Sequence, residues 1–118
     1  METRQAIISF SQSEKVKSGL IWCTQCVHIH ENMPVPEQQG ALRLLQALLA
    51  MIANETHLAR QASGDPIWLE VDKFLNSARV MIDSGVVQEA DFHLTHALSQ
   101  VNRIGQKSMM HLIEQKLL

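Results

Sequence analysis

The chain contains no tyrosine, and aromatic side chains make up only 4% of its 118 residues. Strands favour aromatic and β-branched side chains, so this scarcity argues against a mainly β fold. Leucine, alanine, glutamine and methionine, which favour helices, are prominent instead. A hydrophobic fraction of 46% is ordinary for a globular chain, and this length suits one domain that folds without cross-links. The composition therefore predicts a single all-α domain.

A clustered positive charge is also missing. The formal net charge is −2, and no two Lys or Arg residues come closer than Lys15 and Lys17. Nucleic-acid binding draws most of its affinity from a concentrated basic surface. The one basic surface that folding could assemble is a small patch of Arg79, Arg103 and Lys107. We therefore expect no nucleic-acid partner.

Long apolar runs are absent too. The longest, residues 44–53, is interrupted by Gln46 and is far shorter than the roughly 18 residues of a membrane span. The first ten residues lack the apolar core of a signal peptide. We expect a cytoplasmic protein with no membrane contact.

The only two cysteines lie in WCTQCVHIH, residues 22–30. Covalent haem attachment needs C-x-x-C-H, and Val27 separates Cys26 from the histidine. A redox pair usually lies at a helix N-terminus, where the dipole lowers the pKa of a thiol, whereas this pair falls about three turns into a predicted helix. The spacing therefore argues against both haem attachment and redox chemistry.

A metal site is the remaining chemical interpretation of this stretch. Cys23, Cys26 and His30 share one helical face, but zinc takes four tetrahedral ligands and no second ligand pair is evident. Free cysteine more often serves as a small buried hydrophobe. We expect no cofactor, and keep a metal- or cofactor-binding bundle using these three residues as the alternative function.

Helix signals divide the chain into four segments. Ser11 and Glu14 fit the S-x-x-E capping box, which predicts a helix over about 12–33 and leaves residues 1–11 as an N-terminal extension. Pro34 and Pro36 separate this helix from a second over about 37–62. Asp65-Pro66 begins a third over 66–83, and a fourth runs over about 87–117. Short connections then predict an antiparallel up-down-up-down four-helix bundle spanning 12–118 as one domain.

Two segments carry more apolar surface than a bundle core requires. The second helix is apolar over a wide arc, which is typical of a helix that also faces a partner. The fourth helix is longer than the third, so its end is left to be covered by residues 5–10 or by a second subunit. The predicted interface residues are Leu42, Leu49, Met109, Met110, Leu112 and Ile113.

No catalytic constellation stands out. Glu89, His93 and His96 lie at helical spacing, but the Glu-x-x-His pairs of di-metal bundles are missing, and Asn54-x-x-His57 is a poor substitute. His111, beside Met109 and Met110, is the residue to watch for a pH- or metal-responsive assembly. We therefore expect a non-enzymatic interaction or regulatory module that self-associates or docks a protein partner.

Overall fold

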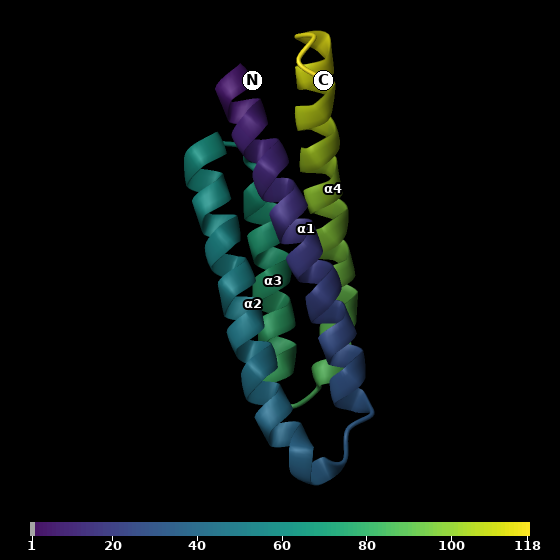
Figure 1. Cartoon of the computed structure of the whole chain (residues 1–118). Coiled ribbons are helices and arrows are strands. Elements are labelled where there is room, and N and C mark those ends of the chain that lie inside the picture. The colour runs from purple at the N-terminus through teal and green to yellow at the C-terminus, as the bar shows by residue number, and fades with distance from the viewer. Residues whose placement is uncertain (1) are drawn as a thin grey trace.

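Four long helices account for most of the computed structural model, which describes residues 2–118. They are α1 (Thr3–Glu31), α2 (Val35–Ser63), α3 (Ile67–Asp83) and α4 (Ala90–Glu114), with a short 3-10 helix, η1 (Val87–Glu89), before α4. Contacts join α1 to α2, α2 to α3, α3 to α4 and α4 to α1, but not the diagonal pairs. The described chain is therefore the predicted antiparallel four-helix bundle, with both termini at the same end (Figure 1).

The first helix begins nine residues earlier than predicted. Glu2 precedes it, and the Glu2 N–H donates to Gln5 Oε1 at 3.2 Å. The Ser11–Glu14 pattern lies inside the helix, so the predicted extension over 1–11 was wrong for the residues from Thr3 onward. The physical reason is burial: Ala6 and Ser9 continue the buried stripe of α1 and are fully covered, which favours helix over a cap at Ser11.

The other boundaries differ less from the prediction. Pro36 lies in the first turn of α2, where its missing N–H costs nothing. Gly64 ends α2 in the left-handed conformation, with φ of 70°, and its N–H donates to the Arg60 carbonyl. The fourth segment opens with the 3-10 turn η1 and ends at Glu114, three residues before the predicted end.

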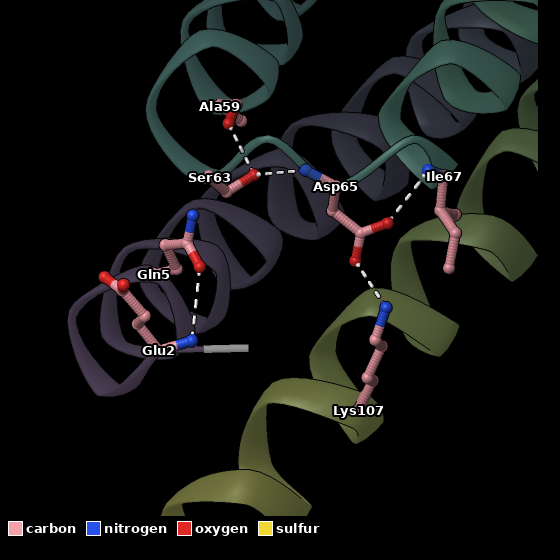
Figure 2. A network of polar contacts seen from close by, with 7 residues as sticks. All are labelled: Glu2, Gln5, Ala59, Ser63, Asp65, Ile67 and Lys107. Atoms are coloured by element: carbon pink, nitrogen blue, oxygen red, sulfur yellow. Dashed lines mark hydrogen bonds and ion pairs between the residues drawn. The ribbon is translucent and has the colours of Figure 1, made fainter.

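The turn between α2 and α3 is tied to α4 by a buried carboxylate (Figure 2). Asp65 Oδ1 accepts from the N–H of Ile67, the first residue of α3, at 3.0 Å, while Pro66 is the N-cap residue. Its other oxygen accepts from Lys107 Nζ at 3.2 Å. Because Asp65 is almost fully buried, the Lys107 ammonium supplies the partner that a buried charge requires.

The core runs along the centre of the bundle and takes residues from all four helices. Cys23 and the fully buried Trp68 both belong to it, together with aliphatic side chains of all four helices. The α1–α4 contact is built from small residues, and an ideal Cβ placed on Gly105 would lie only 3.1 Å from Ser13 Oγ. These two helices therefore approach closely, with Ser9, Ser13 and Ser108 buried between the aliphatic layers.

Candidate functional site

The most apolar exposed surface lies along the groove between α1 and α2. We call it the α1–α2 face and define it by Trp22, Ile29, Leu44, Leu48 and Met51. The exposed fractions are 61% for Trp22, 75% for Leu44 and 61% for Met51. Large side chains exposed to this degree lose most of the free energy that burial would provide, and clusters of them are typical of interaction surfaces.

A hollow of about 550 Å³ lies in this face. Helices α1 and α2 approach closely at Gly19, where an ideal Cβ would lie 3.0 Å from Ile52 Cγ1, and both residues line the hollow. The lining residues are Lys15, Val16, Gly19, Trp22, Leu48, Ala50, Met51, Ile52, Asn54 and Glu55.

A second hollow of about 230 Å³ continues the groove toward the α1–α2 turn. Leu48 lines both hollows, so they lie next to each other along the groove. The lining residues of the second are Cys26, Ile29, His30, Met33, Ala41, Leu44, Leu45 and Leu48. The α1–α2 face thus extends along about half of both helices.

Charged side chains are confined to the ends of the face. No Asp, Glu, Lys or Arg lies between Lys17 and Glu31 on α1, or between Arg43 and Glu55 on α2. Residues of these two segments line the same two hollows in the half of the bundle near the α1–α2 turn. The middle of the face therefore offers apolar and neutral polar side chains only.

One end of the face is closed by a polar cluster. Lys15 Nζ lies 3.0 Å from Glu55 Oε1, and Gln12 Nε2 donates to Glu55 Oε2 at 3.2 Å. The hydrogen bond from Gln12 and then that from Lys15 hold the pKa of Glu55 below its usual value. These contacts stabilise the carboxylate, so the Glu55 charge is already satisfied within the chain.

Other hollows in the described residues are more polar. The hollow between α2 and α3, about 470 Å³, is lined by Asp72, Lys73, Asn76 and Arg79 besides apolar residues of α2 and α3. The hollow between α1 and α4, about 340 Å³, includes Glu14 and Lys17. Among these four hollows of the described residues, those of the α1–α2 groove have the most apolar lining.

The structure places the predicted interface residues in three different environments. Leu49 and Leu112 are buried within the chain's own core, and Leu42 is half-buried against it. These three side chains are therefore not an exposed surface. Met109, Met110 and Ile113 are exposed near the end of α4, away from the α1–α2 face.

Sequence reasoning missed the residues that do form the α1–α2 face. Leu44 and Met51 flank the buried stripe of α2, and Trp22 lies off the buried stripe of α1. Each was visible in the sequence as apolar, but the helical period alone did not say which edge of a wide apolar arc faces a neighbouring helix. The sequence signal that could have identified them is a segment without charged residues in each helix, between Lys17 and Glu31 in α1 and between Arg43 and Glu55 in α2. These two segments line the same groove in the fold.

The cysteines have separate environments. Burial, followed by the nearby Cys26, raises the pKa of the Cys23 thiol to about 12. Cys23 is therefore a neutral core side chain, in agreement with its place on the apolar stripe. Cys26 and His30 are half-buried and line the same hollow of the groove. Residues 2–118 hold no group of three or more His, Cys, Asp or Glu side chains arranged to take a metal ion.

The histidine-rich part of α4 forms an aromatic cluster. The His96 ring stacks on Phe74 at 5.2 Å and lies 4.4 Å from the Phe92 ring, while His93 meets Phe92 edge-on. Glu89 belongs to η1 rather than to α4, so it does not extend the His93–His96 stripe. This part of the surface packs α3 against α4.

Comparisons with protein-family models, curated proteins and solved structures found no match to this chain. No helix among the described residues is both long enough and apolar enough to cross a membrane. The geometry of the α1–α2 face is therefore the basis for a functional interpretation.

Proposed function

We propose that this chain is a non-enzymatic interaction module that docks a protein on its α1–α2 face. The observation that carries the proposal is a row of two adjacent apolar hollows, free of formal charge at its centre, with Trp22, Leu44 and Met51 projecting into solvent. Protein interfaces have this organisation, an apolar centre with a polar rim, and tryptophan is enriched among the residues that dominate binding energy.

The chemistry of the α1–α2 face favours binding over catalysis. The Glu55 carboxylate and the Lys15 ammonium group pair with each other, so neither of them faces the hollow without a partner. Groove recognition of helical partners uses this type of surface, because apolar side chains at helical spacing enter a continuous apolar channel. The two free cysteines are consistent with a cytoplasmic location, which remains part of the proposal.

Site-specific photo-crosslinking tests this function. A photoreactive amino acid is placed at Leu44, on the face, or at Val80, an exposed residue of α3. In cells that naturally express the chain, position 44 is expected to give discrete covalent adducts with protein, and position 80 is not. Adding Met51→Glu to the Leu44 probe should remove the adducts, because it places a charge on the α1–α2 face.

The comparison between position 44 and the control position 80 decides the result. Equal adducts from 44 and 80, or adducts from 44 that survive Met51→Glu, would contradict docking on this face. The circular dichroism melting curve of each variant shows that the fold is retained, since both substituted side chains are exposed.

A further inference from the structure

We propose that the partner on the α1–α2 face is a second copy of this chain, packed about a two-fold axis that crosses the uncharged middle of the face. This inference rests on the proposed function, because both use the same surface. In such a dimer each copy presents Trp22, Leu48 and Met51 to the same residues of its partner copy.

The distribution of charge fits a surface that meets itself. At a two-fold axis a residue lies opposite its own copy, so any charged side chain there would face a like charge. The α1–α2 face has no Asp, Glu, Lys or Arg between Lys17 and Glu31 or between Arg43 and Glu55. Docking of an unrelated acidic or basic partner would instead be favoured by complementary charge, which this face does not offer.

The shape of the face is also self-complementary. Trp22 projects, with 61% of its surface exposed, and it stands at the wall of the 550 Å³ hollow. An isologous interface requires that the projecting group and the receiving hollow belong to one patch. Trp22 of one copy entering the hollow of the other, and the reverse, satisfies this requirement with a single type of contact.

The uncharged part of the face is smaller than a standard interface and suits a weak, reversible dimer. Residues 18–30 of α1 span roughly 20 Å at 1.5 Å per residue. Two adjacent helices about 10 Å across therefore present roughly 400 Å² over this length, about half of what each partner contributes to a standard interface. The net charge of −2 leaves little long-range repulsion between two copies.

Sedimentation equilibrium of the purified full chain tests the inference at chain concentrations of about 1 to 100 µM, the range in which a dimer of modest affinity dissociates. The expected result is a reversible monomer–dimer equilibrium that reaches twice the chain mass of 13.3 kDa. Trp22→Ala should raise the dimer dissociation constant by about 30-fold or more, as for a dominant interface tryptophan. Met51→Glu should abolish the dimer.

Two matched variants control for non-specific effects. Phe92→Ala removes an aromatic side chain with the same 61% exposure, from α4, and Val80→Glu adds the same charge to α3. Neither is expected to change the dissociation constant by more than about twofold, since exposed sites away from an interface contribute little. Thermal melting of each variant, followed by circular dichroism, confirms folding.

The outcomes separate this inference from the proposed function. One outcome is a monomer at every concentration together with adducts from position 44 that contain a protein other than a second copy of the chain. This outcome overturns self-association and leaves docking intact. A monomer with no adducts overturns both. A dimer that Trp22→Ala and Met51→Glu leave unchanged uses another surface, and overturns the inference as well.

Discussion

At the scale of single residues, the fold places side chains of the same type in different environments, even where they are close together in the sequence. Trp68 is fully buried while Trp22 is mostly exposed, and Cys23 is buried in the core while Cys26 lines the groove. Each of these differences follows from which helix face meets a neighbour. Residue type predicted an average tendency to be buried, and the packing of four helices decided the individual case.

The two cysteines should therefore differ in reactivity. The raised pKa of Cys23 means that the unfolded chain deprotonates this thiol at lower pH than the folded chain does. Thiolate formation therefore favours unfolding, and the stability contribution of Cys23 is present below about pH 9 and lost as pH rises toward 12. At pH 8 we expect a thiol-specific reagent to label Cys26 rapidly and Cys23 only on unfolding.

Mass spectrometry of partly labelled protein measures the two rates. Cys26→Ser should remove the fast phase, and Cys23→Ala should remove the slow one. Comparable rates at both positions in native protein would contradict the burial of Cys23.

At the scale of elements, the α1–α4 contact depends on small residues. The Cβ of an alanine at position 105 would lie 3.1 Å from Ser13 Oγ but 3.8 Å from Ser13 Cβ. Ser13 is buried, and its hydroxyl donates to the Phe10 carbonyl at 2.8 Å, so moving it away costs a hydrogen bond. The Ser13 hydroxyl on α1 therefore determines whether position 105 on α4 can accept a side chain.

Gly105→Ala is a test of this close approach. Gly→Ala inside a helix normally raises the free energy of unfolding by up to about 1 kcal/mol. We expect this gain for Gly40→Ala in α2, because nothing lies within 4 Å of the new Cβ. We expect no gain for Gly105→Ala, and recovery of the gain when Ser13→Ala is combined with it.

Urea unfolding of the two single variants and the double variant gives the coupling energy between positions 13 and 105. A value of about 1 kcal/mol or more is expected for residues in such contact. Additive effects would show that α1 and α4 are farther apart than the structure places them.

The first helix shows why a local pattern gave the wrong boundary. A capping box stabilises a helix end only where the preceding residue leaves the helix. Here Ala6 and Ser9 pack in the interior, and this burial outweighs the modest stabilisation that a cap at Ser11 offers. The packing of α1 against α4, which is distant in the chain, therefore decided where the first helix begins.

At the scale of the whole molecule, the bundle measures 54 × 21 × 18 Å, and the α1–α2 face follows its long direction (Figure 1). In the proposed dimer this face is buried through apolar area rather than through ion pairs. We therefore expect the dimer dissociation constant to change by less than about threefold between roughly 50 and 500 mM NaCl, over which screening would weaken exposed charge pairs.

Sedimentation equilibrium at the two salt concentrations makes the measurement. A tenfold or greater weakening with salt would indicate that association depends on the charged ends of the bundle instead of its uncharged face. Lys15→Ala is the informative variant in that case, because Lys15 contributes a charge at one end of the groove.

The sequence by itself determined the helical class, the number of long helices and the turns near Pro34 and Asp65, because these depend on local propensity and on the positions where a helix must stop or start. It also determined that α2 carries more apolar residues than one neighbour can cover. Only the tertiary structure decided that Leu49 faces the core while Leu44 and Met51 face solvent. A wide apolar arc has several possible inward directions, and the positions of α1 and α3 on either side of α2 select one of them.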